Sequence, residues 1–532
     1  MPRHPGALRR RAAGMALLVL LLLVCGAPSG TAAEPGPAPV DAQALAGRLY
    51  ASGQAPHWLE GGQHQARLAL DLLAAAAEHG LDPAYYRSAE LSDRLAALRG
   101  PGDEAAFERA LSTAVLQYLA DLRAGRTRSP YRPQGDALAG FDPVEHLRQA
   151  VRSGGLAQAV ETAAPALPLY RRVKETLARY RALAADAPEW PALPAGAGPT
   201  LAVGDAYAGA PALRARLRML GDLGPEQEAG GEEAGREPVY TPALAAAVRR
   251  FQARHNLVED GLLGPATRTA LAVPPAQRAL QLGLTLERLR WLPPLRGRVV
   301  AVNVPTYRLW AFETGRDTTE PLEMRVIVGK AAGTPTPLFI GQMRFLEFNP
   351  YWNVPRSIAI GEILPKLVRN PAYLRRNDME LVMPDGRVLA QPNAVSLAAL
   401  RAGAARIRQR PGPRNALGEV KFAMPNPMSI YLHSTSAKEL FDKARRDLSH
   451  GCIRVEHAAE LAQFVLADPA NWGPGQVAAA MQPGPTRTVA LAAPVPVILF
   501  YATAVTDQHG RALFAEDIYG RDRHLAKALR PP

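Results

Sequence analysis

The sequence predicts a multidomain α+β protein in which a largely helical N-terminal half precedes a mainly β domain. Apolar residues in the first half recur every three or four positions, the spacing of one helix face. After Arg298, short apolar runs alternate with turn residues, as strands and hairpins do. Stretches rich in Pro and Gly mark the boundaries. The chain has 532 residues, which suggests roughly three or four domains of about 150 residues each.

Residues 34–197 are expected to form a helical scaffold domain. One amphipathic stripe consists of Phe107, Leu111, Val115, Leu116 and Leu119, and another of Tyr170, Val173, Leu177 and Tyr180. Residues at such spacing share one face of a helix. Nothing in this region clusters catalytic side chains, so we expect it to be structural.

Residues 198–274 predict a small module of three short helices. Thr241-Pro242 has the order of an N-cap and a first helical residue, and Gly264-Pro265 opens the last helix. The run AVRRFQARHNLVEDGLLGPATRTAL, residues 247–271, resembles the peptidoglycan-binding domain of many wall enzymes. A generic helical bundle is the alternative.

A helical connector at residues 275–297 leads into the β domain, residues 298–506. The runs VVAVNVP, RLWAFE and MRVIVG alternate as strands do. A Pro- and Arg-rich stretch at about 356–427 breaks this rhythm and reads as an inserted flap over a site, with a helical piece near residues 363–368. The polar residues 507–532 are expected to form a tail that wraps the surface.

The N-terminus, residues 1–33, has the order of an export signal. Arg3 and residues 9–11 are basic, residues 12–24 are apolar, and Thr31-Ala32-Ala33 offers small residues for cleavage. The apolar run is shorter than the ~20 residues that span a bilayer. An uncleaved anchor, which would associate with the membrane, is the main alternative. Val24 argues against a lipoprotein at Cys25.

The formal net charge is +13 at pH 7, and arginine supplies most of the positive charge. The base composition of a GC-rich genome explains this, and attraction to an anionic polymer or membrane surface is the functional alternative. Because no basic helix or aromatic-interleaved basic strand is present, we expect no nucleic-acid partner.

Cysteine usage is the most informative feature of the composition. The chain has two cysteines, Cys25 and Cys452, and removal of the signal would leave one. Thiols in an oxidising compartment usually pair. A single thiol cannot pair internally, so Cys452 is either a buried inert residue or a reactive one.

The segment SHGCIR, residues 449–454, surrounds this thiol with groups that can activate it. A thiolate, not a thiol, is the nucleophile, and the positive charge of Arg454 favours the thiolate. Gly451 has no Cβ, so a substrate carbonyl could approach the backbone. A helix expected over residues 456–466 would place its positive N-terminus near Cys452.

Two histidines could take the proton of Cys452. His450 lies two residues away, on the same face of a strand, and His433 closes the apolar run that begins at Ile430. These residues alone leave the choice open. A zinc site built from the two histidines, Cys452 and His457 fits no common spacing. His457 reads as a helix-surface residue, and no carboxylate is placed to orient His433.

His433, 15 intervening residues and then Ser-His-Gly-Cys with a following Arg resemble the signature of the L,D-transpeptidase (YkuD-type) catalytic domain. The resemblance implies that His433 is the base and Cys452 the nucleophile. It also implies that the amides of Gly451 and Cys452 form the oxyanion hole. Asn is also common where Arg454 stands. The remaining catalytic-motif residues are Ser449, His450 and Arg454.

The run Tyr351-Trp352-Asn353-Val354-Pro355 resembles a segment that borders the donor groove of this domain. Trp352, Asn353 and Tyr431 are therefore expected to bind substrate, with core packing as the alternative for Trp352. The order of helical scaffold, peptidoglycan-binding module and catalytic domain with an inserted flap resembles the large Gram-negative type of L,D-transpeptidase. This implies a periplasmic location.

The resemblance implies a reaction in which Cys452 attacks a donor tetrapeptide stem and an amine of an acceptor stem resolves the thioester. The product is a 3→3 cross-link in peptidoglycan. Neither a metal nor an organic cofactor is required, and carbapenems should acylate Cys452. An L,D-carboxypeptidase and an enzyme that attaches proteins to peptidoglycan would use the same site. A non-catalytic wall-binding protein is the alternative of another class.

Overall fold

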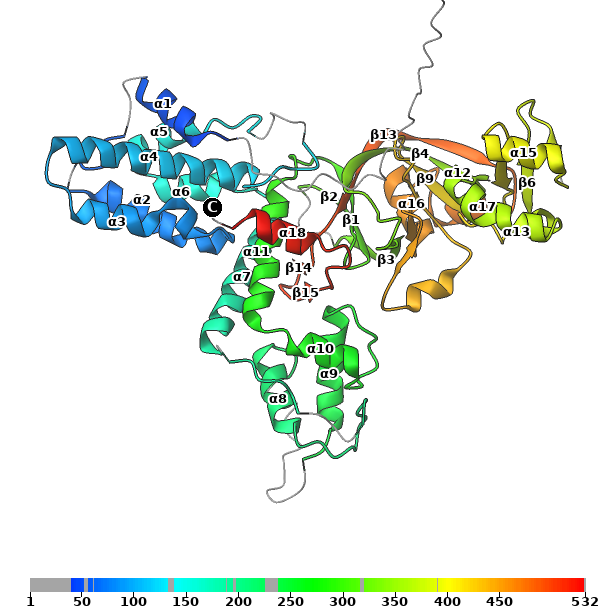
Figure 1. The fold of residues 1–532 in the computed structure, drawn as a ribbon, viewed down its shortest axis with the longest axis horizontal. Helices are drawn as coiled ribbons and strands as arrows, with labels where there is room; N and C mark the ends of the chain where they lie inside the picture. Colours follow the sequence, from blue (N-terminus) through cyan, green and yellow to red (C-terminus); the bar gives the residue numbers. More distant parts are fainter. Residues whose placement is uncertain are drawn as a thin grey trace, which may run out of the picture.

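The computed structural model describes residues 40–51, 56–60, 62–132, 138–187, 189–194, 198–224, 238–315, 320–389 and 391–530. The predicted signal peptide, residues 1–33, lies outside them. Figure 1 shows a helical region at one end, a mainly β domain at the other and a small helical module projecting from the middle. This multidomain α+β architecture confirms the predicted fold class. Of the helices in these described ranges, none combines the length and the apolar character that crossing a bilayer requires.

The helical region is organised around one long helix, α4 (Pro101–Ala124). Its predicted apolar stripe, from Phe107 to Leu119, is buried, and burying each such side chain contributes about 1.5–3 kcal/mol. Pro101 occupies the first turn, and Asp103 and Glu104 place negative charge at the positive end of the helix dipole. The surrounding helices are α1 (Ala42–Ala51), α2 (His64–Ala74), α3 (Ser88–Ala96), α5 (Pro143–Ser153) and α6 (Leu156–Ala163), with 3₁₀ turns at Ala75–His79 and Pro83–Tyr86.

Two helices join this region to the β domain. The predicted stripe of α7 (Pro168–Asp186) is buried against α11 (Pro275–Arg290), the expected connector. The two helices lie side by side in Figure 1. Buried charge reinforces the junction, because the Glu287 carboxylate of α11 accepts hydrogen bonds from the N–H (2.8 Å) and hydroxyl (2.7 Å) of Thr127.

The small module contains the three expected helices, α8 (Ala210–Met219), α9 (Pro242–Arg254) and α10 (Pro265–Ala272). Thr241 caps α9, because its hydroxyl accepts the Leu244 N–H at 3.3 Å. The apolar residues of α8 and α9 close a core of their own.

The β domain is a nine-stranded sheet with the order β11-β3-β12-β10-β9-β4-β13-β1-β2. Because β3 also pairs with β2, the sheet curves back on itself. The strands are β1 (Arg298–Asn303), β2 (Arg308–Glu313), β3 (Leu322–Gly329), β4 (Phe339–Phe348), β9 (Val420–Ala423), β10 (Leu432–His433), β11 (Asp447–Ser449), β12 (Ile453–Val455) and β13 (Arg487–Phe500). The predicted strand runs form β1, β2 and β3.

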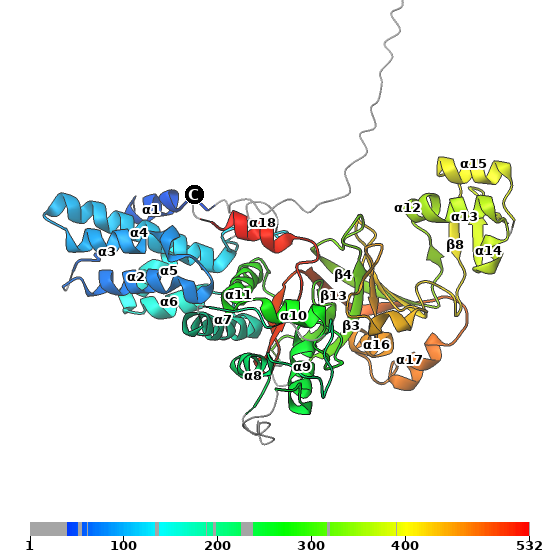
Figure 2. The same ribbon diagram turned by 60° about the horizontal axis from the view of Figure 1, so that its bottom comes forward.

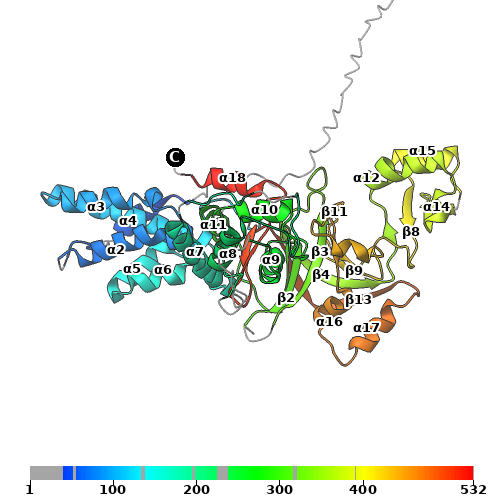
Figure 3. The same ribbon diagram turned by 90° about the horizontal axis from the view of Figure 1, so that it is seen from below.

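Helix α16 (Ala458–Leu466) packs on one face of this sheet, because its Leu461 and Val465 share the core of Leu432 and Ile453. Helix α17 (Pro474–Met481) follows it. In Figures 2 and 3 the insertion projects at the upper right, and α16 and α17 lie below it.

The insertion is a packed subdomain rather than a simple flap. A four-stranded sheet, β5-β8-β6-β7, and several helices enclose its apolar core. The expected end near residue 427 is too late: β9 pairs with β4 and β10 in the main sheet, so the insertion ends after β8. Its elements are β5 (Trp352–Asn353), α12 (Arg356–Ile358), a π-helical turn (Ala359–Ile363), α13 (Leu364–Arg369), α14 (Tyr373–Arg376), β6 (Met379–Val382), β7 (Val388–Leu389), α15 (Ala394–Ala402) and β8 (Arg406–Gln409).

The C-terminal segment departs from the predicted surface tail. Strand β15 (Ala512–Phe514) pairs with β14 (Ala504–Thr506), and α18 (Arg521–Ala528) follows. Phe514 is buried in the core shared by α7 and α11. The polar composition of residues 507–532 therefore did not indicate that this segment packs against α7 and α11, the helices that join the domains.

Candidate active site

Cys452 and His433 lie on neighbouring parallel strands. His433 ends β10 and Cys452 immediately precedes β12, with Leu432 paired to Ile453 and His433 to Arg454. Successive side chains of a strand point to opposite faces. Since Leu432 and Ile453 enter the core, His433 and Arg454 face the other side of the sheet, while Cys452 is partly packed against that core.

Tyr431 links the thiol to the insertion. It interacts with the Cys452 thiol and with Trp352 of the insertion, while the Cys452 sulfur lies 3.7 Å from the Ser429 carbonyl oxygen, to which the thiol donates. The ring centroid of Tyr431 lies 5.7 Å from that of His433. Burial is the main cause that raises the pKa of Tyr431, so the hydroxyl remains a donor. Asn353, the neighbour of Trp352, is exposed on β5.

The His433 ring is buried and oriented by the backbone. Its Nδ1 lies 2.5 Å from the carbonyl oxygen of Ser434. Because a carbonyl only accepts, Nδ1 carries the proton and Nε2 keeps a lone pair. Burial and then the nearby charge of Arg454 lower the pKa of His433 to about 3. The imidazole is therefore neutral at neutral pH.

The Cys452 environment contradicts the expected activation of the resting thiol. Burial raises its pKa, and the opposing effects of Tyr431, Lys421 and Arg454 are smaller. The expected helix start at residue 456 is also wrong, since α16 begins at Ala458 and β12 separates it from the thiol. A macrodipole acts within about one turn of the helix end. The resting pair is consequently a neutral thiol beside a neutral imidazole.

The loop before Cys452 is held by Ser449. The Ser449 hydroxyl donates to the Cys452 carbonyl at 2.6 Å and accepts the Gly451 N–H at 3.1 Å. Gly451 has a φ of +113°, which favours glycine. The Gly451 N–H, expected to face an oxyanion, is thus engaged within the loop. The Cys452 N–H has no hydrogen-bond acceptor among the described residues.

His450 points to the insertion rather than serving the thiol. Its Nε2 lies 2.5 Å from a carboxylate oxygen of Glu362, in the π-helical turn. The side chains are 33% and 46% exposed. This contact joins the insertion to the residue two positions before Cys452.

The four residues of the conceivable zinc site do not form one ligand set. His450 bonds to Glu362, and His457 lies near Glu456 and Glu460 at 3.7 and 3.9 Å. Within the described residues, no three His, Cys, Asp or Glu side chains gather as metal ligands.

Positive charge lines the same face of the sheet. Arg454 is partly buried, and its Nε has no acceptor among the described residues. On the neighbouring strand, Lys421 pairs with Glu347 at 2.7 Å and lies 5.0 Å from the ring centroid of Tyr431. These cations favour negative charge near the thiol.

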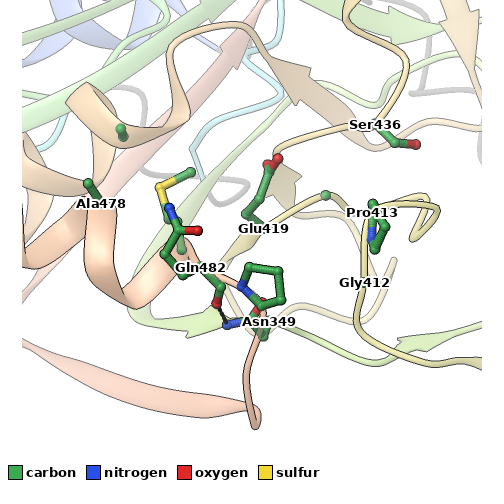
Figure 4. A pocket seen from close by; sticks show the side chains of 11 residues that line it. Asn349, Gly412, Pro413, Glu419, Ser436, Ala478 and Gln482 are labelled. Carbon is green, nitrogen blue, oxygen red and sulfur yellow. Dashed lines mark hydrogen bonds between the residues drawn. The ribbon is translucent and has the colours of Figure 1, made fainter.

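A cavity of about 390 Å³ lies beyond His433, where β10 ends and β9 begins. Figure 4 shows Glu419 between Ser436 and Gln482 in this cavity. The Ser434 hydroxyl donates to the Glu419 carboxylate at 2.5 Å. Neither Cys452 nor His433 lines the cavity, so it is separate from the thiol.

Residues outside the motif complete the site, and no pattern in the sequence pointed to them. Glu362 reaches His450, and Thr336 donates to the Gly451 carbonyl at 2.8 Å. Tyr519 contacts the loop that contains Thr336. Each of these residues lies more than 80 positions from its partner in the sequence. No local sequence pattern can predict such contacts.

Comparison with known families identifies three parts of the chain. Residues 297–497 match the family described as the L,D-transpeptidase catalytic domain (YkuD). The chain carries an L,D-transpeptidase domain of the YkuD family. Residues 44–177 match the "Scaffold domain" and residues 211–271 the "Putative peptidoglycan binding domain". The L,D-transpeptidase domain therefore follows the helical scaffold and wall-binding module that the sequence predicted.

A curated relative is the "Putative L,D-transpeptidase" of Haemophilus influenzae, 32% identical over 246 residues. The match covers 46% of this chain and 48% of that protein, so the chain spans about half the length of this relative. A crystal structure of L,D-transpeptidase (Yku) from Stackebrandtia nassauensis is 14% identical. That match covers 57% of this chain and 97% of the other, with a TM-score of 0.22.

Proposed function

We propose that this protein is an exported cysteine acyltransferase that forms 3→3 cross-links between peptidoglycan stems. The observation that carries the proposal is that Tyr431 lies beside His433 and interacts with the Cys452 thiol within the L,D-transpeptidase domain. The substrates are a donor tetrapeptide stem and an acceptor stem. The scaffold and the wall-binding module support action on the cell wall, and an N-terminal export signal would deliver the protein to the periplasm.

The chemistry begins from a neutral pair. As Cys452 Sγ attacks the carbonyl of the diamino acid at the third stem position, its proton passes to Nε2 of His433. The tetrahedral intermediate collapses to a thioester, and His433 protonates the amine of the departing D-Ala. An acceptor amine then attacks the thioester with His433 as base. Such proton transfers contribute about 10²–10⁴-fold to rate.

The developing oxyanion needs donors that are not already engaged. The Cys452 N–H is one, since it donates to no acceptor in the described structure. The Tyr431 hydroxyl is a second, because it interacts with the thiol only in the resting state and is released once the sulfur has attacked the carbonyl. We assign the hole to these two donors in place of the Gly451 amide, which is bonded to Ser449. Loss of one such donor costs about 2.7–4 kcal/mol in comparable enzymes.

The insertion would favour transfer over hydrolysis. Two contacts hold it over the site, Trp352 to Tyr431 and Glu362 to His450. Excluding water protects a reactive thioester from hydrolysis. Trp352 and Tyr431 would border the donor stem, with the exposed Asn353 at the rim. Arg454 supports the thiolate by its charge.

The decisive experiment is product analysis. Purified protein is incubated with tetrapeptide-bearing muropeptides, and products are identified by mass spectrometry. The proposal predicts 3→3 dimers and free D-Ala with the wild type, neither with Cys452→Ala, and a carbapenem adduct on Cys452. Absence of both products with the wild type would exclude catalysis on stems.

The same assay separates the alternatives. D-Ala release without dimers indicates an L,D-carboxypeptidase, and a stem attached to a protein lysine indicates an attachment enzyme. If Cys452→Ala binds sacculi and complements a deletion as well as the wild type, the protein acts only by binding the wall.

A further inference from the structure

The C-terminal segment reaches back beneath the nucleophile loop. Tyr519 lies outside residues 297–497, which match the L,D-transpeptidase domain. Its hydroxyl donates to the Gly329 carbonyl at 2.5 Å and accepts the Thr336 N–H at 3.1 Å. One side chain thereby closes both ends of the loop 329–336.

This loop contacts the nucleophile loop directly. The Thr336 hydroxyl accepts the Gly329 N–H at 2.9 Å and donates to the Gly451 carbonyl at 2.8 Å. A Cβ at Gly329 would lie 3.0 Å from the Gly451 Cα, so the two backbones are in close contact. The Thr334 hydroxyl donates to the Ser449 carbonyl at 3.2 Å. Ser449 and Gly451, which precede Cys452, are thus both held by residues of the loop 329–336.

Tyr519 is itself fixed by its own segment. Its N–H donates to the Tyr501 hydroxyl at 2.9 Å, and that hydroxyl donates to Asp517 at 2.6 Å. Further along, Asp522 pairs with Arg288 of α11 at 2.5 Å. The segment is therefore anchored on the connector helix, and the Tyr519 hydroxyl has little freedom to move.

We propose that Tyr519 is a positioning residue of the active site, which sets the place of Cys452 through the loop 329–336. The inference rests on the proposed function where it is tested by cross-linking kinetics. Its second test, alkylation of the Cys452 thiol, needs no such activity. Catalytic geometry tolerates little displacement, since a shift of about 1 Å can cost about 10²-fold in rate. Tyr519 contacts neither the thiol nor His433 in the described structure, so its effect passes through backbone.

The test compares Tyr519→Phe with Tyr131→Phe in the full chain. Both remove a tyrosine hydroxyl that donates to a backbone carbonyl, but the Tyr131 hydroxyl bonds to Leu499 at 3.2 Å and does not touch the loop 329–336. We expect Tyr519→Phe to lower kcat for cross-linking about tenfold with KM within about twofold, the equivalent of ~1.4 kcal/mol in the barrier. Tyr131→Phe should leave both constants within about twofold of wild type.

Alkylation of Cys452 by iodoacetamide gives a second readout that needs no peptidoglycan activity. Loosening the loop should expose the thiol, so Tyr519→Phe should be alkylated about fivefold faster at pH 8, with its pH profile moved to lower pH. If kcat and the alkylation profile of Tyr519→Phe equal those of Tyr131→Phe, the inference is wrong. An inactive wild type would refute the proposed function while the alkylation comparison still decides the inference.

A second pair of variants covers the case in which Tyr519→Phe does not fold. Thr336→Val removes the hydroxyl that holds Gly451, and Thr336→Ser retains it. The inference predicts the same losses for the valine variant and near-wild-type behaviour for the serine variant. Equal behaviour of the two variants would overturn it.

Discussion

Ser449→Ala is the sharpest single test of the loop that presents the nucleophile. Ser449 is 3% exposed, and its hydroxyl serves two backbone groups at once. It donates to the Cys452 carbonyl at 2.6 Å and accepts the Gly451 N–H at 3.1 Å. Alanine occupies less space and makes neither bond, so both backbone groups lose their partner.

The expected magnitude follows from those two bonds. A buried polar group left without its partner costs about 1–3 kcal/mol, and part of the cost is recovered where solvent reaches the loop. We therefore expect the L,D-transpeptidase domain to lose about 2–4 kcal/mol, or roughly 5–10 °C in melting temperature for about 200 residues. Ser449→Thr keeps the hydroxyl and should lose less than about 1 kcal/mol.

Activity should fall further than stability alone explains. Measured below the melting transition, kcat for dimer formation should drop roughly 10–100-fold in Ser449→Ala because Cys452 is no longer held in register with His433. The threonine variant should stay within about threefold of wild type. Wild-type kcat in a folded Ser449→Ala protein would refute the role given to this hydroxyl.

Three further predictions concern the insertion, the thiol and the buried histidines. Glu362→Ala removes the contact with His450, so hydrogen exchange in residues 356–409 and the release of D-Ala by water should both increase. The free energy of unfolding should change by less than about 1 kcal/mol, as for other exposed pairs. Unchanged hydrogen exchange would exclude the contact. Because burial raises the pKa of Cys452, its alkylation rate should keep rising with pH above the range of ordinary thiols, and a plateau below pH 8 would contradict this. Burial, followed by nearby cations, lowers the pKa of both His433 and His79 to about 3. Unfolded histidines bind protons below pH ~6.5, whereas these two stay neutral in the folded protein. The free energy of unfolding should therefore be highest above that pH and fall as pH drops toward 3. In His79→Gln, calorimetry should find that it falls less steeply with pH.

The sequence was most informative where one local pattern decides the outcome. The stripe on α4 predicted its buried face because helical spacing is fixed. Cys452 drew attention because it is the one cysteine outside the predicted signal peptide. The resemblance then paired it with His433 rather than His450, and this pairing stays a prediction, since the structure shows only that His433 ends the strand next to the one that Cys452 precedes.

The remaining features depend on contacts that no local pattern encodes. His450 meets Glu362 across 88 residues, and Tyr519 meets Gly329 across 190. Strand β10 has only two residues, too few for an alternating pattern. The sequence also did not predict that the pKa of Cys452 is raised. Burial of the thiol outweighs the effect of nearby cations such as Arg454, which the sequence does show.

If Cys452 carries the acyl group between stems, the thioester can be trapped on it. Protein incubated with a donor tetrapeptide and no acceptor amine is quenched in acid, digested and analysed by mass spectrometry. We expect the mass of the tripeptide acyl group on the peptide that contains Cys452. It should be absent from Cys452→Ala and should accumulate in His433→Gln only at a much lower rate. Release of D-Ala with no adduct on Cys452, or an adduct on another residue, would contradict this role of Cys452.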